Sequence, residues 1–213
     1  MRIRYLLMVF LLLSFTNTFA QLDIGAYSGL GLGKFKGDQA GDGKYNKLIS
    51  ANYGLIFDLT LSDQLILSLQ PGLSGKGTRI SYSVKGEPEP VDSIAIKINY
   101  FSIPLLIKIS SKNEHFYAIG GLEAGLPLSA TAEFIAKLDD KRDVLNHLSD
   151  INLVMHFGVG YRIPVGKPTL FIEARYLQGL NNAVPLERPE YNYFPRVRTS
   201  DIQLLFGIEF SLF

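Results

Sequence analysis

Apolar and polar residues alternate with a period of two along much of the chain, which is the pattern of β-strands with two unlike faces. The pattern is clearest near the C-terminus, where one face would carry Ile202, Leu204, Phe206, Ile208, Phe210 and Leu212. The opposite face would carry Gln203, Gly207, Glu209 and Ser211, with Leu205 as an apolar exception. The period predicts that the chain is built from β-strands.

Eight such runs follow one another: residues 22–33, 48–61, 64–76, 94–109, 115–126, 150–163, 168–179 and 200–213. Each run is roughly ten to sixteen residues long, whereas strands of ordinary globular proteins average about five or six. A strand that crosses a bilayer at a tilt needs about nine to eleven residues. The run lengths therefore favour a membrane barrel over a β-sandwich.

The connections between the runs alternate between short and long. The short ones are residues 62–63, 110–114 and 164–167, and the long ones are residues 34–47, 77–93, 127–149 and 180–199. This alternation is typical of an up-and-down barrel with turns on one side and loops on the other. We therefore expect both chain ends to lie on the short-turn side, in the periplasm. The apolar residues of 138–148 would form one short helix in the third long loop.

The N-terminus has the pattern of a cleaved signal peptide. Arg2 and Arg4 precede an apolar run at residues 5–15, and Thr18-Phe19-Ala20 places small residues where a signal peptidase reads. A membrane-anchoring helix is the alternative, but such a helix needs about twenty apolar residues. We predict a signal peptide at residues 1–20 and one outer-membrane β-barrel domain at residues 21–213.

The amino-acid composition further limits the class of protein to which the chain can belong. The chain has no cysteine, which excludes disulfides and thiolate metal sites, and its net charge of +1 argues against a nucleic-acid partner. Charged residues make up 19%, below the roughly 25% of soluble domains. The 11 tyrosines and 14 phenylalanines suit strands.

Alternation alone does not say which face points outward, since a soluble lipocalin-type barrel would have its apolar side chains inside. The apolar faces are too uniformly large for the interior of eight strands, which has little room. The other faces carry glycines and sparse charges of both signs, and buried charges persist only when they are paired. We predict a lumenal charge network formed by Asp58, Lys108, Glu123, Arg162, Glu173, Arg175 and Glu209. Such a network would occlude the lumen, so a porin-like barrel without a diffusion pore is expected.

A few apolar residues fall on the polar faces. Ile56, Val154 and Phe171 are isolated exceptions, but Ile94, Ile96 and Ile98 are all out of phase with the run that follows them. A β-bulge near Tyr100 would restore the phase of that strand.

The segment Tyr-Phe-Ser-Ile-Pro-Leu-Leu-Ile-Lys at residues 100–108 resembles the signature of the PorT-like outer-membrane β-barrel proteins. Gly158-Val159-Gly160-Tyr161, Glu173-Ala174-Arg175-Tyr176 and Gly207-Ile208-Glu209-Phe210 are also similar to that family. The resemblance covers essentially all of residues 21–213. It implies a barrel in contact with outer-membrane lipid, inserted by the barrel-assembly machinery. One member acts in protein secretion, so an accessory role in a secretion or transport assembly is the alternative function.

No catalytic residue, metal site or cofactor is predicted. The one enzyme hypothesis that the residues leave open is a hydrolase with His156, Glu123 or Glu173, and a serine such as Ser129. A triad is recognised by geometry, which a sequence does not give. The favoured function is structural, or binding of a surface glycan or a protein through the fourth long loop. Its candidate residues are Arg188, Tyr191, Tyr193, Arg196 and Arg198.

Overall fold

The computed structural model describes residues 21–38, 43–82, 92–134, 141–183 and 196–212, and the predicted signal peptide at residues 1–20 lies outside them. In these ranges the chain forms one antiparallel sheet of 11 strands. The strands are β1 (Leu22–Gly37), β2 (Lys44–Asn46), β3 (Leu48–Ser62), β4 (Leu65–Leu69), β5 (Gly72–Tyr82), β6 (Asp92–Ser110), β7 (Phe116–Phe134), β8 (Lys141–Asp143), β9 (Asn152–Pro164), β10 (Pro168–Gly179) and β11 (Val197–Ser211).

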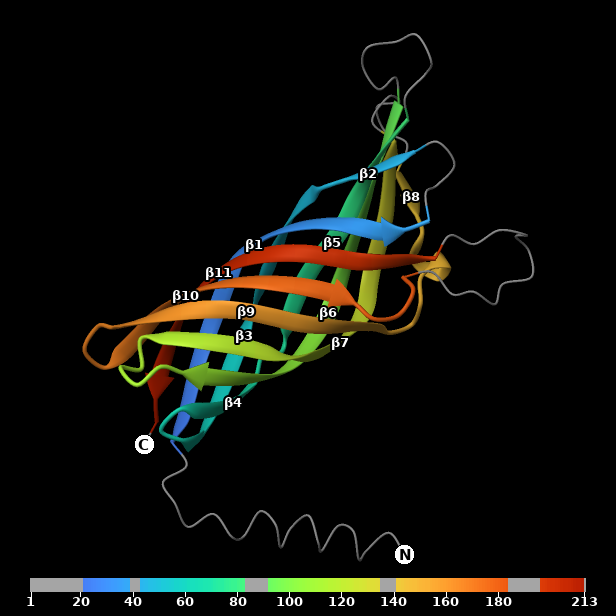
Figure 1. Cartoon of the computed structure of the whole chain (residues 1–213). Coiled ribbons are helices and arrows are strands. Elements are labelled where there is room, and N and C mark those ends of the chain that lie inside the picture. Colours follow the sequence, from blue (N-terminus) through green and yellow to red (C-terminus); the bar gives the residue numbers. More distant parts are fainter. Residues whose placement is uncertain (1–20, 39–42, 83–91, 135–140, 184–195, 213) are drawn as a thin grey trace, which may run out of the picture.

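The sheet closes into a barrel because β1 pairs with β3 along one edge and with β11 along the other. Closure pairs the first strand with the last, so neither is left as a free edge of the sheet. The ring runs β1, β3, β4 with β5, β6, β7, β9, β10 and β11, and β2 and β8 are short additions to β5 and β7. Figure 1 shows the start of β1, the end of β11 and the tight turns at one end of the barrel. The predicted all-β, eight-stranded antiparallel up-and-down barrel is confirmed.

The third predicted strand is divided into β4 and β5 by Gln70 and Pro71. Proline has no N–H to donate to a ladder, so a strand tends to break at this residue. The Gln70 N–H donates instead to the Pro104 carbonyl at 3.0 Å, and the Leu55 N–H donates to the Pro71 carbonyl at 2.9 Å. These two hydrogen bonds keep the residues between β4 and β5 paired with the neighbouring strands, so the chain stays in the barrel wall at this point.

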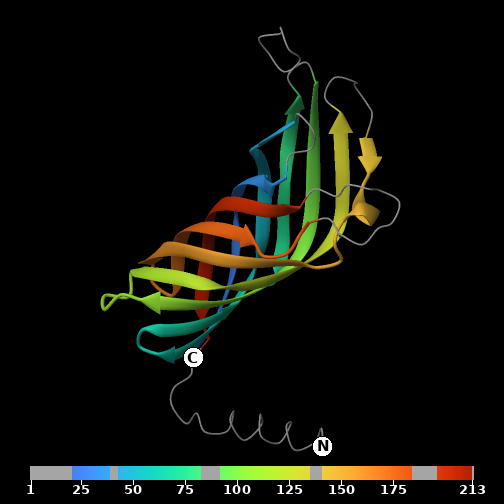
Figure 2. The ribbon, with the colours of Figure 1, turned by 45° about the vertical axis from the view of Figure 1, so that its right-hand side comes forward.

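Several strands run further than the sequence pattern predicts. β5 ends at Tyr82 rather than residue 76, and β7 ends at Phe134 rather than residue 126. Figure 2 shows β5, β6 and β7 rising beyond the other strands, at the end away from the chain ends. Backbone pairing continues there, and in β7 the alternation continues in the opposite phase, with Ala130 and Ala132 buried and Ser129 exposed.

The helix predicted at residues 138–148 is wrong within the described residues. Lys141–Asp143 form β8, and only a single 3₁₀ turn, η1, follows at Leu145–His147. Leu148 is buried in an interior cluster, and Val144 and Leu145 pack against the same cluster without a longer helix. Among the described residues, no helix is long and apolar enough to cross a membrane.

The outer wall is apolar. On β11, Phe206 and Ile202 are about half exposed, whereas Gln203 and Glu209 on the opposite face are buried. The exposed apolar side chains continue around the ring, for example Val159 on β9 and Leu122 on β7. The predicted orientation of the strand faces is thus the one observed.

The apolar exceptions of the sequence pattern point into the barrel. Ile56, Phe171 and Leu205 are buried together with Tyr27 in one interior cluster. A second cluster lies toward the end away from the chain ends and consists of Phe35, Ile98, Tyr100, Ala130, Leu148, Ala183 and Val197.

The irregularity expected near Tyr100 is present but acts differently from the prediction. The register shifts between Asn99 and Tyr100 because β7 contributes the extra residue, Leu128. The alternation of β6 itself therefore continues without a phase change. Ile98 stays inside the barrel, fully buried, rather than moving to the outer wall.

Candidate functional site

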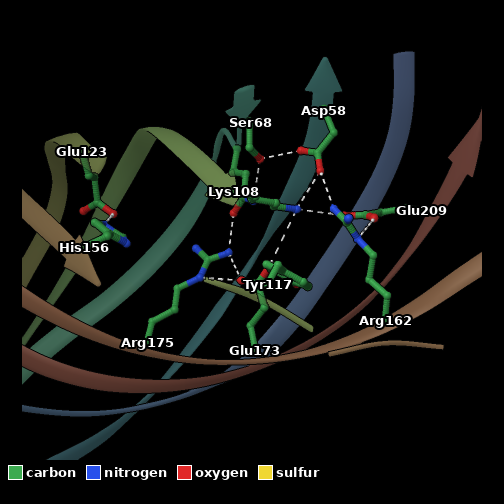
Figure 3. A network of polar contacts seen from close by, with 11 residues as sticks. Asp58, Ser68, Lys108, Tyr117, Glu123, His156, Arg162, Glu173, Arg175 and Glu209 are labelled. Carbon is green, nitrogen blue, oxygen red and sulfur yellow. Dashed lines mark hydrogen bonds and ion pairs between the residues drawn. The ribbon is translucent and has the colours of Figure 1, made fainter. Parts of the chain in front are cut away.

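A cluster of charges fills the lumen near the short-turn end (Figure 3). Lys108 of β6 is fully buried at its centre. Its Nζ donates to Oδ2 of Asp58 at 2.7 Å and to Oε1 of Glu209 at 3.0 Å, and it lies 3.8 Å from Oε1 of Glu173. One ammonium group therefore interacts with carboxylates from three other strands.

Two arginines balance these acids. Arg162 of β9 places Nη2 3.5 Å from Oδ2 of Asp58 and Nε 3.5 Å from Oε2 of Glu209. Arg175 of β10 binds Oε2 of Glu173 through Nε at 2.6 Å and also through Nη2. Arginine suits this position because its planar fork can contact a carboxylate at two points.

Neutral groups complete the hydrogen bonding around the charges. The Tyr117 hydroxyl donates to Glu173 at 2.5 Å, and the Arg162 guanidinium lies over the Tyr117 ring, 4.7 Å from its centre. Gly160 faces Tyr117 across the β7–β9 pair, and a Cβ there would overlap the phenol ring. The glycine is therefore what leaves room for the tyrosine.

Glu123 of β7 belongs to a separate cluster. It accepts from the Lys76 ammonium at 2.6 Å and lies 2.9 Å from Nε2 of His156, and both contacts are buried. The seven predicted residues are thus all directed into the barrel, but they divide into a group of six and the isolated Glu123.

Two buried charged residues, Lys76 and Asp201, were not predicted from the sequence. Lys76 follows Gly75 at the end of a predicted strand, and Asp201 stands near the start of the last one, where it accepts from the Gln203 amide at 3.0 Å. The period of two in the sequence could have predicted that both side chains face the lumen. Ser74, Lys76 and Thr78 alternate along β5, and Asp201 shares its face with Gln203 and Glu209.

The hydrolase arrangement is not assembled. His156 meets Glu123, but Ser129 is exposed on the wall and accepts a hydrogen bond from the Asn99 amide at 3.0 Å. Within the described ranges, no group of three or more histidine or acidic side chains is placed to hold a metal ion.

The loop residues predicted to bind a partner are only partly described. Arg188, Tyr191 and Tyr193 lie outside the described residues, while Arg196 and Arg198 are exposed at the end away from the chain ends. Arg198 stands directly opposite Lys36 in the β1–β11 ladder. A cavity of about 560 Å³ opens beside them, lined by Lys36, Gly37, Asp38, Gln178, Asn182, Arg196 and Arg198.

A closed ring of eight strand positions with an apolar outer wall and a charged interior defines a small outer-membrane β-barrel protein. Comparison with known families agrees, since the model of the outer membrane protein beta-barrel domain family matches residues 18–184. The chain belongs to this family, and its location is the outer membrane.

Several solved structures are similar to this chain. Ail, the attachment invasion locus protein of Yersinia pestis, is 16% identical, with a TM-score of 0.44 over 89% of this chain and 99% of Ail. Neisserial surface protein A is 12% identical, with a TM-score of 0.47 over 89% and 97%. The outer membrane protease OmpT from Escherichia coli is 11% identical, with a TM-score of 0.43 over 92% and 100%. A search of curated proteins found no match.

Proposed function

We propose that the protein is a non-enzymatic outer-membrane barrel with an occluded lumen, which acts structurally or by binding at its extracellular end. The PorT-like segment at residues 100–108 supports placing it near that group of barrels. Its two chain ends, on the side of the tight turns, would lie in the periplasm.

The observation that carries the proposal is the filling of the lumen. Lys108, Asp58 and Glu173 have no exposed side-chain area, and the interior apolar clusters lie above and beside them. Eight strands enclose only enough space for side chains. Ions would have to break several buried ion pairs to pass.

Conductance tests the occlusion. The protein refolded into a planar lipid bilayer should give no steady single-channel current, while an unboiled gel sample shows that it is folded. Reproducible channels of one size would refute the closed lumen.

The orientation is tested by single cysteines, since the natural chain has none. Asn146→Cys lies in η1 and Lys112→Cys in the tight β6–β7 turn, and both positions are exposed. A maleimide that does not cross the membrane should label the Asn146→Cys variant on intact cells and spare the Lys112→Cys variant. The reverse pattern would place the chain ends outside.

The ligand bound at the extracellular end would carry an anionic group. Lys36 and Arg198 are like charges directly opposite each other, an arrangement that is unfavourable unless something compensates it. Among the described residues, neither side chain is in an ion pair, and the cavity beside them is large enough for a sugar-sized ligand. The matching partner is a surface glycan that carries sulfate or phosphate.

Dextran sulfate is a suitable probe. A Lys36→Glu/Arg198→Glu variant should bind it at least about tenfold more weakly, and salt should weaken the binding of the natural protein. Lys112→Glu, at the other end, is the control. Equal binding by both variants would exclude this cluster as the site.

A further inference from the structure

The wall of the barrel is interrupted between β3 and β5. The ladder joins Asn52, Tyr53 and Gly54 to Ser74, Leu73 and Gly72, and pairing with β5 resumes only where β2 meets residues 79–81. Within residues 43–82, all of which the structure describes, no ladder pair joins residues 47–51 to residues 75–78. In a membrane barrel such a gap is costly, because hydrocarbon offers no partners to free backbone groups.

A cavity of about 490 Å³ lies at this interruption. Its apolar lining is Leu48, Ile49, Ala51, Tyr53, Leu73, Ile98 and Leu128. Ile49, Tyr53 and Leu128 are also exposed on the outer wall, so the apolar side of the cavity is continuous with the surface that faces the acyl chains. The volume lies in the lower half of the range for small-molecule sites, which favours a single chain over a whole multi-chain lipid.

The polar lining is cationic. Lys76 and Lys97 line the cavity, together with Ser50, Ser74, Asn99 and Ser129, and no acidic side chain of the described ranges does. Lys97 is half exposed and pairs with Glu133 at 2.6 Å, which Lys141 also approaches at 3.4 Å, so that two cations share one carboxylate. The cavity therefore presents two ammonium groups to a ligand, each already paired with one carboxylate.

Two buried groups at the cavity have unused hydrogen-bonding capacity. The Ser50 hydroxyl oxygen is buried without a hydrogen-bond partner. Lys76 is buried and its ammonium, with three N–H groups, donates to Glu123 alone among the described residues. A buried polar group left unpaired is unfavourable, and a guest that accepts hydrogen bonds would relieve it.

We propose that this cleft between β3 and β5 binds a single-chain amphiphile with a carboxylate head, that is, a long-chain fatty acid. The acyl chain lies against Ile49, Tyr53, Leu73 and Leu128. The carboxylate accepts hydrogen bonds from Ser50 and from the ammonium groups of Lys76 and Lys97. The site is separate from the Lys108 charge cluster and from the cationic cluster at the extracellular end, and it shares Lys76 with the buried pair that Lys76 forms with Glu123.

Photolabelling tests the site directly. The full protein, reconstituted in phosphatidylcholine vesicles, is irradiated with palmitate that carries a diazirine near the chain end, and the adducts are mapped by mass spectrometry. We expect adducts on Ile49, Tyr53, Leu73 and Leu128, against which the acyl chain lies. Labelling spread evenly around the outer wall would overturn the proposal, because it would mean simple partition into the bilayer.

A variant whose cleft is filled by a large side chain can be compared with a matched control variant. Ala51→Trp puts an indole into the cavity from the outer wall, and Ala26→Trp makes the same change at an exposed wall position on β1 that does not line it. Both variants should show the folded band on an unboiled gel. Ala51→Trp should lose labelling about tenfold and Ala26→Trp should keep it. Equal labelling of the two variants would overturn the proposal.

The head group is tested with a second probe, the corresponding long-chain alcohol. Lys97→Gln should reduce labelling by palmitate about tenfold, since a charge-assisted hydrogen bond is lost, and leave labelling by the alcohol unchanged. Equal labelling of the natural protein by both probes would show that the site does not select a carboxylate.

Discussion

Replacing Lys108 by methionine tests the lumenal charge network most directly. Methionine keeps most of the length of the side chain and removes the charge. In the natural protein one ammonium group lies 2.7, 3.0 and 3.8 Å from three carboxylates. After the replacement, these acids remain buried with less positive charge to balance them.

The expected loss follows from the geometry. Removing one partner of a buried ion pair costs about 3–5 kcal/mol, because the other charge is left without compensation. Arg162 still lies 3.5 Å from both Asp58 and Glu209 and offsets part of this loss. We therefore expect Lys108→Met to lower the free energy of unfolding by about 3 kcal/mol, the lower end of that range.

Urea titration in detergent micelles or thin-bilayer vesicles measures the loss. The chain has no tryptophan, so the folded fraction is best followed by the mobility of unboiled samples on a gel. Lys112→Met, in an exposed turn, is the control and should change stability by less than about 0.5 kcal/mol. The double variant Lys108→Met/Glu209→Gln should be more stable than the sum of the two single losses predicts, by about 0.5–3 kcal/mol. A Lys108→Met variant as stable as the Lys112→Met control would refute the reasoning.

Three further substitutions probe other parts of the barrel, all by the same titration. Gly160→Val should cost about 1–3 kcal/mol, because its side chain displaces the Tyr117 ring from Glu173, and Gly160→Ala should cost less. Phe206→Arg should cost up to about 4 kcal/mol if this half-exposed side chain faces hydrocarbon, and no loss would place it in water. Gly37→Ala should cost about 1 kcal/mol or more, because φ is +135° and a Cβ would overlap the Arg196 carbonyl; a neutral effect would show that the strand end adjusts.

The ring of strands and the orientation of their two faces were predictable, because both determine which positions of the sequence are apolar and which are polar. Ile202, Phe206 and Phe210 repeat every second residue, and the alternation of turns and loops gives the order of strands. The ends of the strands were not predicted from this pattern. β7 continues to Phe134, and its residues beyond the extra residue Leu128 alternate in the opposite phase, with the small apolar side chains of Ala130 and Ala132 facing inward.

The charge clusters were predictable by residue type but not by partner. Lys108 and Glu209 are separated by 101 positions in the chain, and they meet only because the register of four intervening strand pairs brings them to one level. Period two assigns a charge to the lumen but says nothing of its height along the barrel axis. For that reason Glu123 was predicted to join the other acids, whereas it pairs with Lys76 and His156.

A buried charge network is a costly way to fill a small barrel, since apolar side chains of the same volume are often at least as stable. What the charges add is a difference between the two faces of each strand. A shift of one residue in register would exchange the faces, and on β10 it would turn Glu173 and Arg175 toward the acyl chains. A charge near the middle of the bilayer costs about 2–4 kcal/mol for each basic residue, so the exchanged state is strongly disfavoured. With Phe171 and Leu177 also inside, β10 is apolar on both sides over part of its length, and Glu173 with Arg175 is what fixes the inward face.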